Sequence, residues 1–340
     1  MLAENQEMLQ VFRDSGFEIR SNAEGGCISL RLTLTDSPDS ATATDRRDRI
    51  ATVASLRPLF EPRAIAVIGA SRDRANLGRR VFDALVASNH ITNGSAAPSI
   101  FPVNPVATSI NGVGCYRSAR ELPAGIDLAV IAVPAPAVTG VIEDCAAAGI
   151  KSVVVISSGF GEAGGDGPVR QRRLVELVRS YGMRLVGPNC MGVLSLRAGS
   201  YFNASFARRL PSGGHIAMAS QSGGLGLALL ELAAQRRVGL STFISLGNKA
   251  DVSGNDFLQY SEADPATSVI LLYLESIGNP DRFARLARRV SRSIERRSMR
   301  LVPFTRCKVR RVLLNKPRAS NRYSYGPSFL VINPGPGQHA

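Results

Sequence analysis

The sequence predicts a protein of the α/β class, in which short buried strands alternate with helices. Three observations support this prediction: apolar runs recur from Leu56 onward, helical patterns separate most of them, and the first five runs each end at glycine, proline, asparagine or serine. Short apolar runs between helices indicate βαβ units, and hence a parallel sheet with helices on both faces. Ligands of such sheets bind at the carboxyl ends of the strands.

Composition fits this class and directs attention to one end of the chain. The 340 residues include 32 glycines and are 44% hydrophobic, as expected for two or three globular domains. The net charge is +14, but residues 281–340 hold fifteen lysines and arginines and only two acids. A basic C-terminal segment of this kind binds polyanions weakly and without sequence preference, so no specific nucleic-acid partner is predicted.

Membrane, metal and secreted classes are disfavoured by the pattern. The N-terminus has no apolar signal segment, and the longest apolar run, residues 128–142, is too short to span a bilayer and is broken by Pro134 and Pro136. Five scattered cysteines suggest free thiols, and three widely separated histidines form no metal motif. We therefore expect a cytoplasmic protein with no membrane partner and no metal.

The N-terminal part of the chain precedes the alternating pattern. Residues 4–14 have the apolar spacing of an amphipathic helix that ends near Gly16, and residues 28–34 alternate as a half-buried strand does. The polar stretch 35–48 is expected to be a loop within a linker.

Two series of strands and helices follow. In the first, the expected strands are 64–69, 99–103, 127–133, 152–157 and 184–187, and the expected helices are 76–89, 136–148 and 168–181. In the second, strands 214–219, 241–246 and 268–274 alternate with helices 222–237, 253–263 and 280–292. The pattern fails after about Ile294, where no period is evident.

The first strand turns into a helix at a candidate phosphate site. Gly69 permits a tight turn, Ser71 offers a hydroxyl, Arg72 adds positive charge, and the helix N-terminus supplies N–H groups. This is not the dinucleotide fingerprint, because Ser71 stands where that motif needs glycine, and the next glycine is Gly78. The second strand also ends without a ribose-binding acid. NAD is therefore less favoured, and an ordinary turn without a ligand stays open.

The other strand ends add small residues to the same edge. These loops are "VNP" at 103–105, "VPAP" at 133–136, "SSGFGE" at 157–162 and "GPNCMG" at 187–192. Each loop alone is ordinary turn chemistry. Together they predict a rim of small residues that suits a long ligand lying against backbone.

A second candidate phosphate site begins the second series. The segment Ser220-Gln221-Ser222-Gly223 joins a strand to an apolar helix, so two hydroxyls and the helix N–H groups converge there. The alternative is that one of the serines only caps the helix.

These motifs together resemble one family. "AVIGASRDRANLG", "FPVNP", "DLAVIAVPAP", "ISSGFGE", "RLVGPNCMGV", "SQSGGLG" and "SLGNKADVSGNDFLQY" occur in the order found in the α-subunit side of NDP-forming acyl-CoA synthetases, the succinyl-CoA synthetase superfamily. The resemblance covers about residues 56–293. It implies a Rossmann-like, parallel-sheet CoA-binding domain followed by a flavodoxin-like α/β domain that is incomplete here.

The resemblance also implies a ligand and a reaction. The family forms acyl-CoA from an acid, CoA and NTP through an acyl phosphate and a phosphohistidine. The cofactor expected here is coenzyme A, and the expected partner is a nucleotide-grasp domain or subunit. Ser220, Gln221, Ser222 and Gly223 would receive the phosphohistidine. The matching CoA-site positions are Gly69, Ser71, Arg72, Gly78, Asn104, Pro105, Pro134, Glu162 and Asn189.

Both ends of the chain depart from that family. Asn5, Met8, Gly16 and Phe17 resemble the last helix and strand of a GNAT acetyltransferase, whose cofactor loop would lie upstream; an ordinary extension is the alternative. After about Ser293 the expected strand and histidine loop do not appear, so the catalytic residue is unknown. The predicted organisation is a GNAT-like remnant (1–35), a linker (36–55), a CoA-binding domain (56–205), a partial synthetase domain (206–293) and a basic irregular tail (294–340).

Three functions stay open on the sequence alone. An acid–thiol ligase needs a phosphorylatable histidine and a nucleotide partner. A non-catalytic CoA or acyl-CoA module, regulating an acetyltransferase, needs only residues 56–293. An NAD-dependent dehydrogenase is the least favoured. We expect CoA binding to be retained and the chain by itself not to make acyl-CoA.

Overall fold

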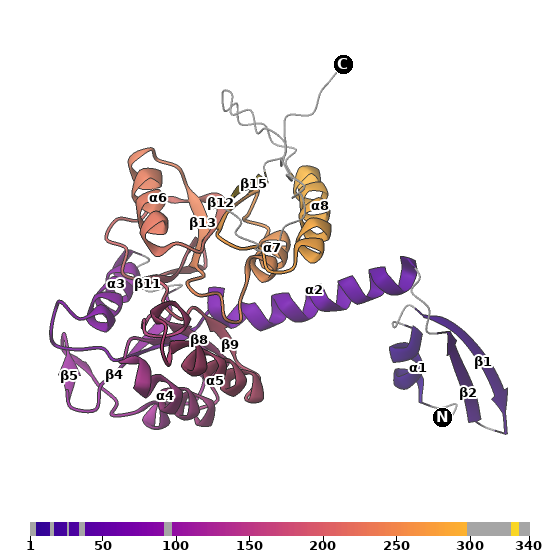
Figure 1. The fold of residues 1–340 in the computed structure, drawn as a ribbon, viewed down its shortest axis with the longest axis horizontal. Helices are drawn as coiled ribbons and strands as arrows, with labels where there is room; N and C mark the ends of the chain where they lie inside the picture. The colour runs from indigo at the N-terminus through magenta and orange to yellow at the C-terminus, as the bar shows by residue number, and fades with distance from the viewer. Residues whose placement is uncertain are drawn as a thin grey trace, which may run out of the picture. The chain divides into compact units, whose positions relative to one another are not determined.

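The computed structural model describes residues 5–13, 17–25, 27–33, 38–91, 97–297 and 328–332. These residues fall into two compact units, Met1–Ser55 and Leu56–Ala340. None of the helices in the described ranges is long and apolar enough to cross a membrane. The candidate site lies entirely in the second unit, many of whose elements are labelled in Figure 1.

The first unit contains a helix and a two-stranded hairpin. Helix α1 (Gln6–Arg13) begins at Asn5, whose Oδ1 accepts a hydrogen bond from the Met8 N–H at 3.0 Å. Strands β1 (Glu18–Glu24) and β2 (Cys27–Thr33) pair antiparallel across a turn at Gly25. The predicted helix and second strand are confirmed. Strand β1 was missed because its side chains are nearly all exposed, so the sequence shows no apolar alternation there.

Helix α2 (Pro38–Phe60) corrects the prediction of a loop at 35–48. Its first half is rich in Ser, Thr and Asp, which favour turns over helix interiors. Its last turn, however, buries Leu56, Leu59 and Phe60 completely in the core of the second unit. Tertiary packing at one end therefore stabilises a helix that local propensity disfavours.

The first sheet of the second unit is parallel throughout, with strand order β4-β3-β7-β8-β9. Its strands are β3 (Ala64–Ile68), β4 (Ser99–Val103), β7 (Leu128–Ile131), β8 (Ser152–Val155) and β9 (Arg184–Val186). Three helices connect them: α3 (Leu77–Ile91), α4 (Ala135–Ala147) and α5 (Gly167–Ser180). Shorter elements complete the connections: β5 (Ser109–Ile110), β6 (Val113–Gly114), and the 3₁₀ turns η1 (Ala119–Glu121) and η2 (Gly161–Ala163).

One face of this sheet carries an apolar core under two helices. Val138 and Ile142 of α4 and Leu174 of α5 pack with side chains from alternate positions of β3, β7 and β8. Helices α4 and α5 lie side by side in Figure 1. Every second residue of each strand faces these helices because successive side chains of a strand point to opposite faces of the sheet.

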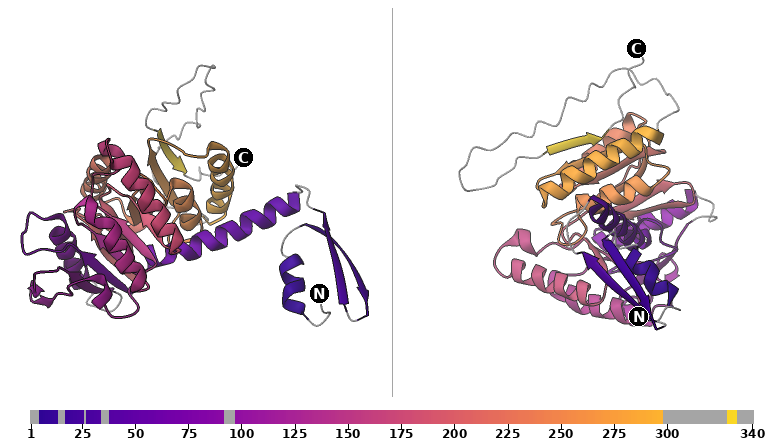
Figure 2. Two further views of the ribbon diagram at one scale, coloured as in Figure 1. Left: turned by 60° about the horizontal axis from the view of Figure 1, so that its bottom comes forward. Right: turned by 90° about the vertical axis from the view of Figure 1, so that its right-hand side faces the viewer.

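The second sheet is mixed, with order β11-β10-β13-β12-β14-β15. Strands β12 (Gly213–Ser220), β13 (Leu240–Ser245) and β14 (Val269–Leu274) are parallel, as the sequence predicts. Helix α6 (Gly223–Gln235) follows β12, α7 (Gly254–Ala263) follows β13, and α8 (Pro280–Arg297) follows β14. Helices α7 and α8 pack together, as both views of Figure 2 show.

Two features of this sheet differ from the predicted organisation of the chain. Strands β10 (Gly192–Arg197) and β11 (Ser200–Ser205), expected in the first domain, form a hairpin that pairs with β13 of the second sheet. Strand β15 (Ser328–Ile332) pairs antiparallel with β14, so the prediction of an irregular tail is wrong for those residues. The rest of 298–340 lies outside the described residues.

The two sheets belong to one unit because α3 packs between them. Helix α3 contacts β3 and β4 of the first sheet and β11 of the second. At that contact the buried Ser88 Oγ accepts a hydrogen bond from the Asn203 N–H at 3.2 Å. The β10–β11 hairpin is therefore the element that joins the first sheet's helices to the second sheet.

Candidate functional site

The turn after β3 brings two predicted glycines into close backbone contact. A Cβ atom placed on Gly78 would lie 2.3 Å from the Gly69 carbonyl oxygen. A Cβ on Gly69, whose φ is +91°, would lie 2.4 Å from the Ala132 carbonyl oxygen after β7. Only glycine fits at either position. The start of α3 is therefore held against the ends of two neighbouring strands.

Asn104 ties the end of β4 to the same turn. Its Nδ2 donates to the Ala70 carbonyl oxygen at 2.6 Å, and its Oδ1 accepts from the N–H groups of Val106 and Ala107. The side chain thereby fixes both the β3–α3 turn and its own loop, which includes Pro105. A role of Asn104 in binding CoA stays a prediction.

Ser71 and Arg72 lie at the entrance to α3. The Ser71 Oγ accepts from the Asp73 N–H at 3.1 Å, and the Arg72 guanidinium bonds to Thr108 Oγ1 and the Ser109 carbonyl oxygen, each at 3.3 Å. Behind them, Arg79 is 8% exposed and donates to the Ser71 and Arg72 carbonyl oxygens. This arrangement turns the loop carbonyls toward Arg79 and leaves Arg72 on the exposed side.

Pro134, Glu162 and Asn189 continue the edge past β7, β8 and β9. Pro134 precedes the first turn of α4. The Glu162 Oε1 accepts from the Gly159 N–H at 2.6 Å, and the Asn189 N–H donates to the Ser157 carbonyl oxygen at 2.9 Å. The structure thus places all nine predicted CoA-site positions along the carboxyl edge of one parallel sheet.

The hydrogen bonds on Glu162 also set its charge. Burial by itself raises the pKa of this carboxyl, but hydrogen bonds from the Asn248 side chain and from the Gly159 and Phe160 backbone outweigh burial, so the net pKa lies below the usual value. Glu162 is therefore a carboxylate at neutral pH. The edge therefore carries a fixed negative charge at Glu162.

The second candidate loop follows β12. Ser222 is the N-cap of α6, and its Oγ accepts from the Leu225 N–H at 3.4 Å. Ser220 is fully buried and its Oγ donates to the Ser222 carbonyl oxygen at 2.7 Å. The Gln221 Oε1 accepts from the N–H groups of Glu275 and Ser276 after β14. Ser222 is thus a helix cap, which is the alternative that the sequence left open. A Cβ on Gly223 would meet nothing within 4 Å.

Sequence reasoning missed the turn that lies between these two edges. Residues 246–250 follow β13, and their backbone bonds to Gly187 and Pro188 on one side and to Ser220 on the other. Asn248 contacts Glu162 and Asn189, and Lys249 contacts Ser276. The turn belongs to a motif that resembles the family, but nothing in its glycine, asparagine and lysine indicated that they would contact both edges.

Among the described residues, Cys145 and Cys190 are buried, and His90 and His215 lie away from both edges. Burial raises the pKa of Cys145 and of Cys190 to about 12, so both thiols are protonated at neutral pH. His90 lies at the end of α3, and the side chain of His215, near the start of β12, bonds through Nδ1 to the Ala266 carbonyl oxygen at 2.9 Å. The described residues contain no cluster of three or more His, Cys, Asp or Glu that could hold a metal ion.

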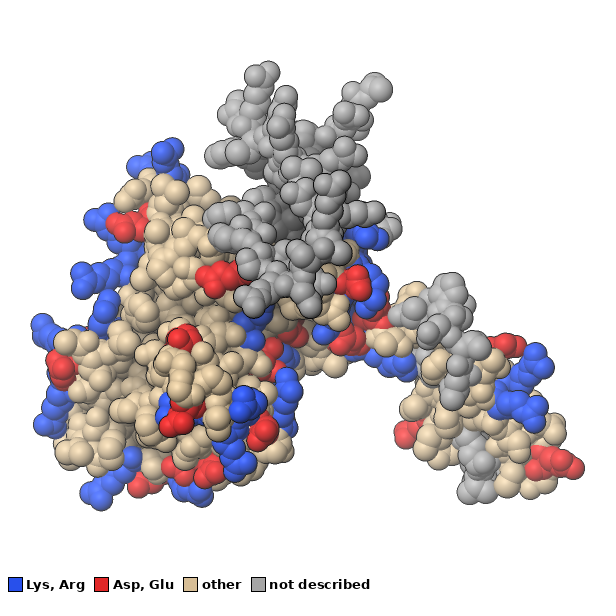
Figure 3. Space-filling model, viewed as in Figure 1, with Lys and Arg blue, Asp and Glu red and all other residues tan. Residues whose placement is uncertain are grey.

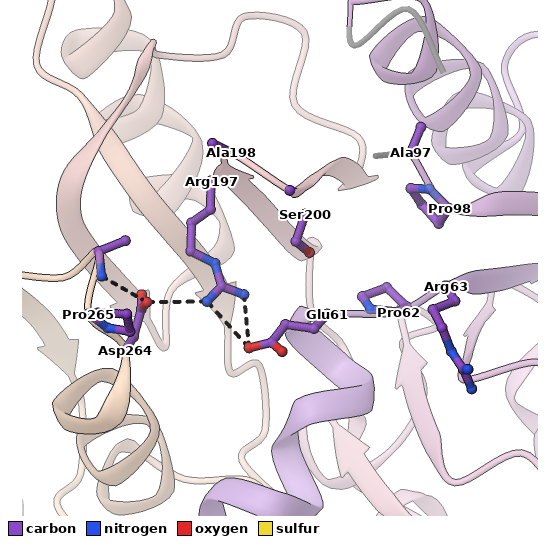
Figure 4. A pocket seen from close by; sticks show the side chains of 12 residues that line it. Glu61, Pro62, Arg63, Ala97, Pro98, Arg197, Ala198, Ser200, Asp264 and Pro265 are labelled. Carbon is purple, nitrogen blue, oxygen red and sulfur yellow. Dashed lines mark hydrogen bonds and ion pairs between the residues drawn. The ribbon is translucent and has the colours of Figure 1, made fainter. Parts of the chain in front are cut away.

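A pocket of about 710 Å³ opens at the opposite, amino end of the first sheet (Figure 4). Arg197 reaches across its floor to Glu61 and Asp264, and these charges satisfy one another. None of the predicted site residues lines this pocket. The hollow is therefore not the predicted ligand site, which is an open edge of strand ends.

Charge on the visible surface gives no further indication of a site. Figure 3 shows basic side chains at the margins of that face, with acidic ones among them and uncharged surface between. Much of the chain's positive charge belongs to residues 298–327, which lie outside the described residues.

The fold and the site define a class: two α/β domains, the first of which has glycine turns at the carboxyl ends of its parallel strands. Comparison with known families identifies each of the two domains. Residues 63–195 match the family described as CoA binding domain, and residues 213–295 match the succinyl-CoA ligase like flavodoxin domain. The chain therefore contains a CoA-binding domain followed by a succinyl-CoA ligase-like flavodoxin domain.

Individual relatives agree with these two families. The chain is 41% identical over 237 residues to acetate–CoA ligase [ADP-forming] I of Archaeoglobus fulgidus, covering 70% of this chain and 33% of the relative. It is 39% identical over 242 residues to the α subunit of acetate–CoA ligase [ADP-forming] I of Pyrococcus furiosus, covering 70% and 51%. The chain thus spans between a third and a half of the length of these relatives.

A solved structure shows the same fold. The dinucleotide-forming acetyl-coenzyme A synthetase 1 of Ca. Korarchaeum cryptofilum, in complex with phosphate and ADP, superposes with a TM-score of 0.65 at 40% identity. The match covers 69% of this chain and 49% of that one. The prediction of a Rossmann-like domain followed by a flavodoxin-like domain is confirmed.

Proposed function

We propose that residues 56–297 are the CoA-binding part of an NDP-forming acyl-CoA synthetase, which converts an acid, CoA and NTP to acyl-CoA, NDP and phosphate. The observation that carries the proposal is the carboxyl edge of the first sheet, where Gly69 and Gly78 pack backbone to backbone, Asn104 bonds to the same turn, and Arg72 lies exposed beside it. The family match of residues 63–195 supports CoA as the ligand.

The residues at this edge fit the chemistry of CoA. CoA carries a diphosphate and a further phosphate, so it needs a cation and free backbone donors rather than a ribose-binding acid. Arg72 supplies the cation at the helix entrance, and the missing Cβ atoms at Gly69 and Gly78 let the turn pack directly against the end of β7 and the start of α3. Asn104, Pro134, Glu162 and Asn189 would line the rest of the molecule's path along the strand ends.

Calorimetric titration of the full chain with CoA, and separately with NAD, tests the proposal. We expect CoA to bind and NAD to bind more weakly or not at all. Substituting Arg72→Ala should weaken CoA about five- to tenfold, because one charged contact is lost. Arg63→Ala is the matched control: Arg63 is an exposed arginine at the other end of β3, and its loss should leave CoA affinity unchanged. Tighter binding of NAD than of CoA would reject the proposal.

The loop Ser220–Gly223 is proposed to hold a phosphoryl group, supported by its place at the start of α6 and its open Gly223. The second catalytic half would come from a nucleotide-grasp domain or subunit. The relatives named as α subunits support a partner of that kind. Acyl-CoA formation should therefore require a second protein. If the chain binds CoA but forms no acyl-CoA even with such a partner, the non-catalytic alternative is favoured.

The proposed location is the cytoplasm, supported by the free thiols of Cys27, Cys115, Cys145 and Cys190. The interpretation of residues 1–35 as the end of a GNAT acetyltransferase domain stays a prediction. Its helix and hairpin are consistent with an ordinary extension as well.

A further inference from the structure

The turn Leu246–Ala250 is wedged between the two candidate edges. The Asn248 N–H donates to the Pro188 carbonyl oxygen at 2.9 Å, and the Leu246 N–H donates to the Ser220 carbonyl oxygen at 2.8 Å. A Cβ on Gly247, whose φ is +54°, would lie 2.3 Å from the Pro188 carbonyl oxygen. The turn therefore cannot shift against either edge without breaking backbone contacts.

One side chain of the turn is bound to the CoA edge. The Asn248 Nδ2 donates to Glu162 Oε2 and, at 2.8 Å, to Gln171 Oε1. Its Oδ1 accepts from Asn189 Nδ2 at 3.3 Å. Asn248 thus contacts two of the predicted CoA-site residues, which come from the loops after β8 and β9.

The next side chain, Lys249, is linked to the phosphate loop through Ser276. Lys249 has φ of +54° and points its Nζ at Ser276, donating to the carbonyl oxygen and, at 2.7 Å, to Oγ. The Ser276 N–H in turn donates to Gln221 Oε1 at 3.2 Å. Burial lowers the pKa of Lys249, with Glu275 opposing that effect. The lysine thus holds in place the segment that fixes the side chain of Gln221.

We propose that Asn248 and Lys249 are positioning residues that couple the CoA edge to the phosphate loop, so that occupation of one site changes the affinity of the other. The inference rests on the proposed function, because it needs CoA at the first edge and a phosphoryl group at Ser220–Gly223. The coupling is expected to be positive, because a ligand at either edge would hold the turn in the arrangement that the other edge also contacts. Coupling of this kind is reciprocal.

The test is a thermodynamic cycle on the full chain, with CoA titrated in the absence and presence of inorganic phosphate. In the wild-type chain we expect phosphate to tighten CoA about fivefold, at the lower end of typical coupling. Lys249→Met should abolish this factor while leaving the affinity for CoA alone within about twofold. Lys249→Arg keeps the charge and should keep part of the coupling. Lys151→Met, a lysine at the amino end of β8, is the control that should change neither quantity.

Each outcome decides the question. If CoA binds but phosphate does not change its affinity, or if Lys249→Met leaves the factor intact, the coupling is rejected and the proposed CoA site stands. If CoA does not bind the wild-type chain, the proposed function fails first. Asn248→Ala is a second variant that should lose the coupling and also weaken CoA binding. Thermal unfolding of Lys249→Met and Asn248→Ala checks that both variants are folded.

Discussion

At the scale of single residues, buried charge is tolerated in this fold only where it is fully paired. Arg197 is 10% exposed and bonds to Glu61 and Asp264, and its Nη2 also donates to the Phe60 carbonyl oxygen at 3.0 Å and to the Tyr260 hydroxyl at 2.9 Å. This group joins the end of α2 to β10 and to the end of α7. A buried pair of this type is costly to break, because the remaining charge is left without a partner.

Substituting Arg197→Met should therefore lower the free energy of unfolding by about 3 kcal/mol or more, since Asp264, with 2% of its side chain exposed, loses its counter-charge. Urea unfolding followed by circular dichroism measures this. The control Arg63→Ala breaks an ion pair whose arginine is 85% exposed, and the change should stay within about 0.5 kcal/mol. Equal effects of the two substitutions would contradict the assignment.

At the scale of elements, the turn from β3 to α3 depends on glycine for space, whereas a mid-helix glycine does not. Gly78 meets the Gly69 carbonyl oxygen, but a Cβ on Gly140 in α4 would meet nothing within 4 Å. The two glycines are thus a matched pair in one fold. The same substitution should have opposite signs at the two positions.

We expect Gly78→Ala to destabilise the protein by about 1–3 kcal/mol, because the added methyl forces the turn apart, and to weaken CoA binding. Gly140→Ala should instead stabilise it by about 0.5–1 kcal/mol, because alanine favours the helix more than glycine does. Thermal unfolding and CoA titration of both variants check this. A neutral Gly78→Ala variant with normal CoA affinity would show that the turn is not close-packed.

At the scale of the whole molecule, parallel topology separates the candidate site from the two histidines that the structure describes, His90 and His215. Strand ends carry the candidate residues, while His90 at the end of α3 and His215 near the start of β12 lie toward the amino ends of their sheets. Asn89 beside His90 bonds to Pro98 before β4, and the His215 carbonyl oxygen accepts from Ser268 before β14. Neither histidine is placed to exchange a phosphoryl group with Ser220–Gly223.

Incubation of the chain with labelled ATP, and separately with acetyl phosphate and CoA, should therefore give no acid-labile, alkali-stable label on His90 or His215. Peptide mapping by mass spectrometry locates any label. The double substitution His90→Asn and His215→Asn is the control and should leave any labelling of the protein unchanged. Loss of label in that variant would place a carrier histidine at the amino end of a sheet and overturn this prediction.

The sequence by itself determined the alternation of strands and helices and the carboxyl edge. Short apolar runs, the glycines at 69 and 78, and the loops after each strand carry local signals of period and turn chemistry. From these, a parallel sheet and a rim of small residues along its carboxyl edge could be predicted, while the nine individual CoA-site positions came from the family resemblance. The same local signals identified Ser222 as a candidate cap.

Tertiary structure decided the features that have no local signal. Helix α2 forms because Leu56, Leu59 and Phe60 pack into a distant core, and β10 and β11 join the second sheet because β13, much later in the chain, offers a pairing edge. The roles of Asn248 and Lys249 depend on contacts with Glu162 and Ser276, which only the fold brings near. Sequence periodicity records which face of an element is buried, but it does not record which distant element covers that face.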